Sequence, residues 1–308
     1  MTRRLATPRK TRTESPLQVR LTHPDRVIFS EPDITKRDLA SYYNQASEWI
    51  LPHVADRPLS LVRCPAGTSG QCFFQKHPPE GLPAVVKRIE IREKEGVNTY
   101  LTISNVEGLV TLVQFGAIEI HAWSARVDDV DKPDRLIFDL DPDPAVDWPA
   151  VVEAALLFRR VFADLGLVAF VKTTGGKGLH VVIPVDRRRD WKTVKSFCKS
   201  TAKRVAAAAP AQYTTNPLKA HRRGKIFIDY LRNERGATAV APYSCRARTG
   251  APVATPVSWD ELRSLSGPQE FTLANVPRRL SRKRRDPWAD VTRVRQSLPS
   301  AGQGKGIM

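Results

Sequence analysis

The sequence predicts an α+β protein whose mixed and antiparallel sheets are flanked by helices. Segments with a two-residue apolar period, typical of strands, are interspersed with segments that have a helical period of about 3.6 residues. Several strand segments follow one another without a helix between them, which favours antiparallel neighbours over a doubly wound parallel sheet. The chain has 308 residues and no internal repeat, so it can bury a large core.

In the first half of the chain, residues 33–51 have helical periodicity behind an Asp or Thr cap, and Pro52 is expected to end this helix. A second, apolar helix is expected over residues 105–115. The strands expected in this half are short and rich in β-prone residues; they are 59–62, 72–75, 85–91, 99–103 and 117–123, the last carrying His121.

In the second half, a strand carries Asp139, and prolines mark the start of a helix over 148–165 and the end of one over 190–209. Further strands are expected over 168–172, 179–184 and 225–231. Residues 241–257 are rich in Pro, Arg and Gly and are expected to form an ordered functional loop. The segment after Leu280 is expected to begin as a basic helix or extension.

Both ends of the chain are expected to lie outside the folded domain. Residues 1–18 are polar, basic and Pro-containing, which is typical of a linker, and the Gly-rich residues 296–308 are expected to form a flexible tail. Residues 19–295 then form the domain. The linker-like start and the Gly-rich tail favour the interpretation that the chain is a fragment of a longer protein.

The charge of the chain is strongly positive. Its 49 Lys and Arg residues against 32 Asp and Glu residues give a net charge of +17. Such a field attracts polyanions, and nucleic acid is the usual polyanionic partner of a basic protein. Solubility alone is the alternative, but it does not account for the compact acidic cluster described below.

The four cysteines, Cys64, Cys72, Cys198 and Cys245, include no C-x-x-C pair. In a chain of this length they are expected to be reduced thiols of a cytosolic protein. Cys64, Cys72 and His77 are close enough in the sequence to suggest a zinc site. No fourth ligand has usable spacing, so no zinc site is predicted. No apolar stretch is long enough to span a membrane, and no signal core is present at the start.

Asp139 and Asp141 stand one residue apart at the end of an apolar run. Side chains alternate along a strand, so both carboxylates project from one face while Phe138 and Leu140 pack on the other. Two such carboxylates can bridge divalent cations roughly 3.5 to 4 Å apart, as in two-metal phosphate chemistry. Because prolines follow the pair, a solvated turn remains the alternative for these residues taken alone.

A third carboxylate, Asp229, lies on the expected strand 225–231. It shares its face with Phe227 and Leu231, and a lone buried carboxylate is costly unless a cation compensates its charge. Arg232 as a structural partner is the alternative to a metal. Together with Asp139 and Asp141, Asp229 would complete the ligand set of a two-metal polymerase site.

The segment 173–180, Thr-Thr-Gly-Gly-Lys-Gly-Leu-His, joins two expected strands. Its glycines let backbone amides converge on an anion, and Thr174, Lys177 and His180 can donate to phosphate oxygens. The spacing of a Walker loop is absent, and a plain hairpin turn is the alternative. A triphosphate loop beside three metal carboxylates indicates nucleotidyl transfer.

Three segments together resemble one known family. They are Ile-Phe-Asp-Leu-Asp-Pro, Lys-Thr-Thr-Gly-Gly-Lys-Gly-Leu-His-Val, and Ala-Pro-Tyr-Ser-Cys-Arg-Ala-Arg-Thr-Gly-Ala-Pro-Val-Ala-Thr-Pro-Val-Ser-Trp. They resemble the polymerase domain of the bacterial multifunctional DNA-repair ligase D, a member of the archaeo-eukaryotic primase superfamily. The resemblance covers about residues 20–290, and the motifs occur in the same order.

This resemblance implies a primase-like polymerase core that uses two Mn²⁺ (or Mg²⁺) ions per site and a nucleoside triphosphate, with preference for ribonucleotides. It also implies action on gapped or primer-template DNA and on DNA ends with a 5′ phosphate, in nonhomologous end joining. The implied partners are Ku and covalently linked ligase and nuclease domains, in the bacterial cytoplasm and associated with the nucleoid.

The resemblance also implies three groups of site residues, carried over by position. The metal ligands are Asp139, Asp141 and Asp229; the nucleotide contacts are His121, Thr174, Lys177, His180, Arg246 and the stacking aromatic Phe74; the DNA contacts are Arg26, Lys36, Arg63 and Arg232. Arg26 and Lys36 resemble a pocket for the 5′ phosphate. Many relatives have Ser where Thr174 stands. For Phe73 and Phe74, strand alternation predicts that only one faces the groove.

The leading interpretation is therefore a template-directed nucleotidyltransferase acting on DNA ends. A two-metal nuclease is the alternative enzyme, although it has no use for a triphosphate loop. A polymerase of the β superfamily is disfavoured because its Gly-Ser helix precedes the paired acids, whereas here the Gly loop follows them. The non-enzymatic alternative is a basic nucleic-acid-binding module.

Overall fold

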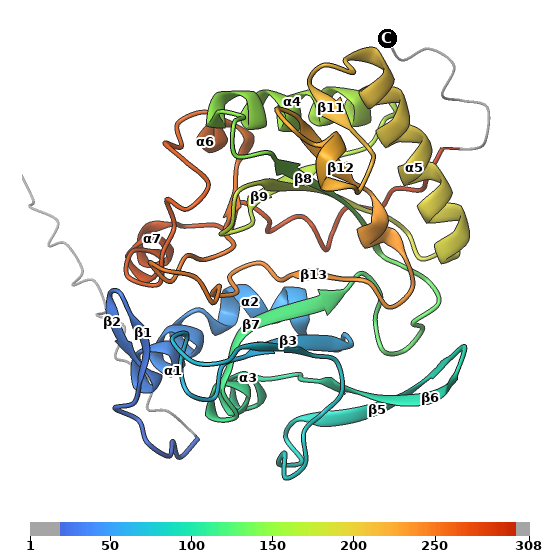
Figure 1. Cartoon of the computed structure of the whole chain (residues 1–308). Coiled ribbons are helices and arrows are strands. Elements are labelled where there is room, and N and C mark those ends of the chain that lie inside the picture. Colours follow the sequence, from blue (N-terminus) through green and yellow to red (C-terminus); the bar gives the residue numbers. More distant parts are fainter. Residues whose placement is uncertain (1–18, 300–308) are drawn as a thin grey trace, which may run out of the picture.

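The computed structural model describes residues 19–299, which form two stacked layers, each built on a six-stranded sheet (Figure 1). The predicted α+β class with antiparallel sheets and flanking helices is confirmed. The N-terminal part of the chain builds the lower layer, and most of the C-terminal part builds the upper one. β13 (Thr238–Val240) returns to pair with the lower sheet, so the chain connects the layers more than once.

The lower sheet has the strand order β13-β7-β3-β6-β5, with β4 paired to β3. Its other strands are β3 (Leu59–Arg63), β4 (Phe73–Gln75), β5 (Lys87–Glu93), β6 (Gly96–Thr102) and β7 (Ala117–Trp123). Beside it lie a two-stranded sheet, β1 (Val27–Ser30) and β2 (Asp33–Thr35), and the helices α1 (Lys36–Gln45), α2 (Ser47–Val54) and α3 (Val106–Gln114). The β5–β6 hairpin projects away from the body of the molecule (Figure 1).

The upper sheet has the strand order β11-β12-β8-β10-β9-β14. Its strands are β8 (Arg135–Pro142), β9 (Phe170–Thr173), β10 (Leu179–Pro184), β11 (Tyr213–Thr214), β12 (Ile226–Asp229) and β14 (Pro256–Val257). The helices of this part are α4 (Trp148–Asp164), α5 (Trp191–Ala208), α6 (Trp259–Leu262) and α7 (Val276–Arg282), with 3-10 turns η1 (Lys219–His221) and η2 (Leu231–Asn233).

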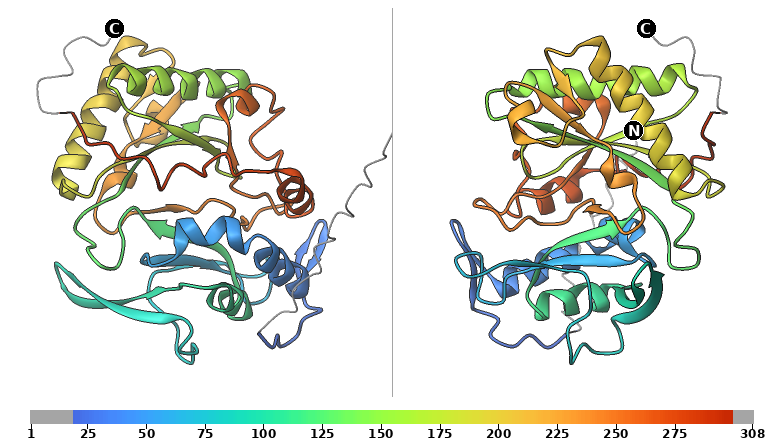
Figure 2. Two further views of the ribbon diagram at one scale, coloured as in Figure 1. Left: turned by 180° about the vertical axis from the view of Figure 1, so that it is seen from behind. Right: turned by 45° about the vertical axis from the view of Figure 1, so that its right-hand side comes forward.

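Helices α4 and α5 cover the face of the upper sheet that points away from the lower layer (Figures 1 and 2). Phe138 on β8 packs against Phe158 and Phe162 of α4, with ring centroids 5.0 and 5.2 Å apart. The apolar face of β8 is therefore sealed by α4. The polar face of β8 points toward the lower layer, so the functional residues lie between the two sheets.

The expected single helix over 33–51 is wrong in two respects. Residues 33–35 form β2, and the helical part divides at Ala46 into α1 and α2. Pro52 lies inside α2 instead of ending it. The missing amide of Pro52 removes one helical hydrogen bond, but burial of His53 and Val54 carries the helix on for two more residues.

The expectation that all cysteines are reduced is wrong for two of them. Cys64 and Cys72 form a disulfide, with their Cα atoms 4.3 Å apart. Antiparallel pairing of β3 with β4 places Arg63 opposite Phe73, so the next pair in this register is Cys64 and Cys72. Cys198 and Cys245 are free and buried, and burial raises the pKa of both thiols.

The folded domain extends beyond its expected end at residue 295. The Gln296 side chain bonds to the backbone of Val168 and Pro184, and Leu298 is buried in the core. The expected linker 1–18 and residues 300–308 of the expected tail lie outside the described residues. Within the described part of the chain, no helix is long and apolar enough to cross a membrane.

Candidate active site

Strand β8 holds the paired acids at the centre of the upper sheet. Alternation along β8 is as predicted, because Phe138 and Leu140 are fully buried while Asp139 and Asp141 are partly exposed on the opposite face. In the pairing of β8 with its two neighbours, Asp139 stands opposite His180 of β10 on one side and Asp229 of β12 on the other. The pairing with β12 thus brings Asp229 to the acids of β8, and the pairing with β10 adds His180.

Arg232 lies among these carboxylates. Its Nε atom is 3.4 Å from Oδ2 of Asp139 and 3.3 Å from Oδ2 of Asp229. Burial opposes ionisation of Asp139, yet His180, Arg232 and Lys172 lower its pKa to about 2. The structural partner considered for Asp229 is therefore present, because Arg232 contacts the acidic cluster in this conformation. Its role as a DNA contact stays a prediction.

The negative charge of the other two acids is only partly compensated. Burial raises the pKa of Asp141 and of Asp229, and the charge of Asp139 raises both further, while Arg222 and Arg232 act in the opposite direction. Nη1 of Arg222 is 3.1 Å from Oδ2 of Asp141. These guanidinium groups supply only part of the positive charge that three neighbouring carboxylates need.

Among residues 19–299, no three acidic, His or Cys side chains converge closely enough in this conformation to hold a metal ion. The donor set nevertheless fits a divalent metal, since Asp139, Asp141 and Asp229 offer hard oxygen ligands from two adjacent strands. Metal binding would require Arg222 and Arg232 to release these carboxylates. Asp139, Asp141 and the Gly loop line a common pocket of about 320 Å³, and Asp229 stands next to it, opposite Asp139 in the sheet.

The Gly loop is the turn of the β9–β10 hairpin, which confirms that it joins two strands. The Thr174 hydroxyl accepts from the Gly176 amide at 3.2 Å and donates to the Gly178 carbonyl at 3.0 Å, so it holds the loop closed. A Cβ at Gly178 would lie 1.9 Å from the Leu140 carbonyl oxygen, so only glycine fits there. The loop is thereby fixed against β8, with Lys177 exposed at its tip.

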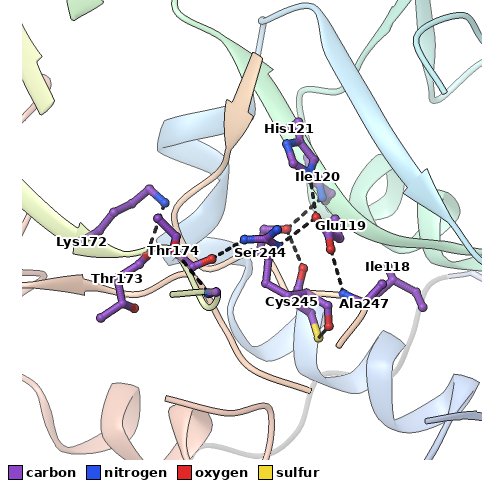
Figure 3. A network of polar contacts seen from close by, with 12 residues as sticks. Ile118, Glu119, Ile120, His121, Lys172, Thr173, Thr174, Ser244, Cys245 and Ala247 are labelled. Atoms are coloured by element: carbon purple, nitrogen blue, oxygen red, sulfur yellow. Dashed lines mark hydrogen bonds and ion pairs between the residues drawn. The ribbon is translucent and has the colours of Figure 1, made fainter. Parts of the chain in front are cut away.

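Glu119 of β7 links the lower layer to the Gly loop through Arg246 (Figure 3). Its carboxylate accepts from Nε of Arg246 at 2.9 Å and from the Ala247 amide at 2.9 Å, and lies 2.8 Å from Nε2 of His121. Arg246 also donates to the Thr174 carbonyl at 2.5 Å. One buried carboxylate therefore orients two predicted nucleotide contacts, His121 and Arg246.

Lys172 and His180 are almost completely buried beside Asp139. Burial and the charge of Arg246 lower the pKa of Lys172 to about 7. Burial and Lys172 lower the pKa of His180 to about 4, so its ring is neutral at pH 7. Nε2 of His180 lies 3.5 Å from Oδ1 of Asp139 and contributes a polar contact there.

Phe73 and Phe74 are both exposed, so neither belongs to the core. They point to opposite sides of β4, as alternation predicts. The Phe74 ring lies edge-on to His121 with centroids 5.4 Å apart, whereas Arg63 lies over the Phe73 ring. Phe74 is therefore the aromatic in contact with His121, which lines the active-site pocket.

Three of the predicted DNA contacts share a second pocket of about 320 Å³, lined by Arg26, Lys36 and Arg63. The Lys36 ammonium donates to the Thr22 carbonyl and to Oε1 of Gln114. Burial and the charge of Arg26 lower the pKa of Lys36. These cations lie close together although they come from three separate segments of the chain.

Three residues of the site were not predicted from the sequence: Glu119, Lys172 and Arg222. A signal existed for the first two. Glu119 stands two residues before His121 on an alternating strand, so the two must share a face. Lys172 is a charged residue on an otherwise apolar strand, the same signal that identified Asp229. Arg222 follows η1, and nothing in its local sequence marks it.

The chain is similar to known proteins of one family. The family described as LigD, primase-polymerase domain, matches residues 35–288. The multifunctional non-homologous end joining protein LigD of Pseudomonas aeruginosa is 41% identical over 285 residues, which are 92% of this chain and 34% of that protein. LigD of Mycobacterium tuberculosis is 33% identical over 313 aligned positions, covering 92% of this chain and 41% of that protein.

A solved structure, the polymerase domain from Mycobacterium tuberculosis ligase D in complex with DNA, is similar in fold. Its TM-score is 0.82 at 34% sequence identity, with 87% of this chain and 96% of that chain covered. The chain spans 34% and 41% of the length of the two curated relatives above, whereas it matches nearly all of the solved polymerase domain.

We predict that Glu119→Gln destabilises the fold by about 3 kcal/mol at pH 7, because Arg246 loses its buried counter-charge. Burial opposes ionisation of Glu119, but His121 and Arg246 lower its pKa from 4.5 to about 2. The ionised form therefore stabilises the fold above pH 4.5, and this contribution is lost as the pH falls toward 2.

Urea denaturation of the wild type and the variant at pH 7 and pH 3.5 measures this difference. The gap between the two proteins should narrow at the lower pH. The exposed Glu95→Gln is the matched control. A Glu119→Gln protein as stable as this control at pH 7 would refute the proposed role of the carboxylate.

Proposed function

Because the chain belongs to the LigD primase-polymerase family, we propose that this nucleotidyltransferase domain extends 3′ ends at gaps and double-strand breaks during nonhomologous end joining. In this proposal it is template-directed, prefers ribonucleotides and uses two Mn²⁺ or Mg²⁺ ions. The observation that carries the proposal is the single pocket that holds both the β8 acids and the Gly loop.

The pocket supplies a place for each part of a nucleoside triphosphate. Lys177 and Arg246 line it and carry the positive charge that phosphate oxygens require. Phe74, exposed and beside His121, offers a ring on which a base can stack, a contact worth roughly 1 to 3 kcal/mol. A nuclease has no need of these nucleotide contacts, and a binding module has no need of the acids.

Asp139, Asp141 and Asp229 would hold the metal ions. When bound, such ions favour deprotonation of a 3′ hydroxyl and neutralise charge on the reacting phosphates. Arg232 balances the charge of Asp139 and Asp229 in the conformation described here. Its ion pairs would have to open as the ions bind, so Arg232 is free to contact DNA only in the loaded site.

The pocket of Arg26, Lys36 and Arg63 is a site for the 5′ phosphate of a gapped or broken end. It meets β7 at Ala117 and Ile118, whereas the active-site pocket meets β7 at His121. Three to four strand residues separate them, roughly 10 to 13 Å. This spacing suits a short gap, with the 5′ phosphate fixing the register of the DNA.

The remaining parts of the proposal concern the whole protein. The two curated relatives above are about two and a half to three times as long as this chain, and their names describe a multifunctional end-joining protein. We infer that this domain acts with covalently linked ligase and nuclease domains and with Ku, at the bacterial nucleoid. DNA is the partner of the solved polymerase domain, which supports nucleic acid as the ligand here.

We expect Asp139→Asn to reduce Mn²⁺-dependent incorporation of labelled nucleotide by about 100-fold or more, because an essential ligand of the metals is lost. DNA binding, measured by fluorescence anisotropy, should persist. Asp143→Asn, on the turn after β8, is the control. Undiminished extension by Asp139→Asn would exclude this site, and cleavage of DNA in place of extension would favour the nuclease.

Arg26→Gln should lower the preference for a 5′-phosphorylated gap over a 5′-hydroxyl gap by about tenfold, since one charge-assisted contact is lost. Extension of a simple primer-template should be nearly unchanged. Arg37→Gln, which removes a neighbouring exposed charge paired with Asp25, is the control. Equal losses on all three substrates would contradict the assignment of this pocket.

A further inference from the structure

A third pocket lies at the opposite end of β8 from the catalytic acids. It has a volume of about 400 Å³, and its lining includes five arginines, Arg57, Arg126, Arg135, Arg187 and Arg295, and two acids, Asp134 and Asp186. Arg135 begins β8, four residues before Asp139, which is roughly 13 Å along a strand. The pocket is therefore separate from the active site and from the pocket of Arg26 and Lys36.

The pocket forms where the two layers join. Arg57 precedes β3 of the lower sheet, Arg126 lies on the connection from β7 to β8, and Arg135 pairs with Pro184 at the end of β10. The C-terminal segment, with Val291, Val294 and Arg295, lines another wall. Four segments that are distant in the sequence thus contribute cations to one hollow.

The acids of the lining do not balance its arginines. Arg187 has one further partner outside the lining, because its Nη1 lies 2.6 Å from Oδ2 of Asp128. Asp134 is shared by three guanidinium groups: Arg57 binds both of its oxygens, and the Nε atoms of Arg126 and Arg135 lie 3.3 and 3.4 Å away. Asp186, the other acid of the lining, accepts from the Ser297 hydroxyl. Counted over the lining alone, five positive charges face two negative ones.

Two further observations favour an anion as the ligand of this pocket. Nε of Arg57 and Nε of Arg187 are buried, yet they have no hydrogen-bond partner among residues 19–299. Arg57 itself is completely buried. Burial and the charge of Arg57 lower the pKa of Arg135 to about 9, which is the direction expected where guanidinium groups lack counter-charge.

We propose that this arginine pocket binds a phosphate group, independently of the active site. Arginine forks match the tetrahedral oxygens of phosphate and bind them with paired, charge-assisted hydrogen bonds. The phosphate belongs either to a free anion or to a nucleic-acid backbone that continues past the end of β8. In both cases it would bridge the lower sheet, the upper sheet and the C-terminal segment.

The test uses a background protein, Arg26→Gln/Lys177→Gln, in which the other two phosphate sites are weakened. Arg126→Gln/Arg295→Gln is added to remove two partly or fully exposed cations of the pocket, and Arg263→Gln, an exposed arginine elsewhere, is the control for lost charge. Inorganic phosphate at constant ionic strength is titrated, and the rise in Tm gives its apparent Kd. If the double change prevents folding, Arg295→Gln alone replaces it. Among residues 19–299, the Arg295 side chain bonds only to the backbone carbonyls of Thr292 and Val294.

The pocket variant should bind phosphate about tenfold more weakly than the control. A labelled single-stranded oligonucleotide then distinguishes the two sources. If the variant also lowers the slope of log affinity against log salt by about 1 to 2, the phosphate belongs to nucleic acid; an unchanged slope identifies a free anion. An equal phosphate response in the variant and the control would overturn the proposal, and the arginines would then be a closed ion-pair network.

Discussion

The pairing register of β8 is the constraint on which the rest of the site depends. Because β8 lies between β10 and β12, one register places Asp139 opposite both His180 and Asp229. A shift of one residue would turn the acids into the core beneath α4 and bring Phe138 and Leu140 to the surface. The close contact of Gly178 with the Leu140 carbonyl allows no side chain at the start of β10, so the Gly loop and the acids share this constraint.

The second requirement is that the two layers remain in fixed positions. Glu119 and Arg246 provide this on the side of the active site, because one residue lies on the lower sheet and the other reaches the Gly loop of the upper sheet. At the far end of β8, Asp134 and its arginines lie where the layers join again. Buried charge therefore occurs on both sides of the sheet interface, and the active-site pocket lies between the layers.

Much of this arrangement could be predicted from the sequence, because strand alternation is a local property. Alternation predicted that Asp139 and Asp141 share one face of a strand. It also showed that Asp229 is a carboxylate on the face of an otherwise apolar strand. Local patterns cannot show which strands become neighbours, so Arg222 was not placed beside Asp141, and the Cys64–Cys72 disulfide required the β3–β4 register. The extra short strands escaped notice because two to four residues have no measurable period.

We propose that Asp139, Asp141 and Asp229 form one metal centre despite their contacts with Arg222 and Arg232. Binding of Mn²⁺ in the presence of a nucleoside triphosphate, followed by electron paramagnetic resonance, tests it without relying on turnover. The account predicts that Asp229→Asn binds fewer ions, or binds them more weakly, than either the wild type or Asp143→Asn. Identical number and affinity of bound ions in all three proteins would contradict it.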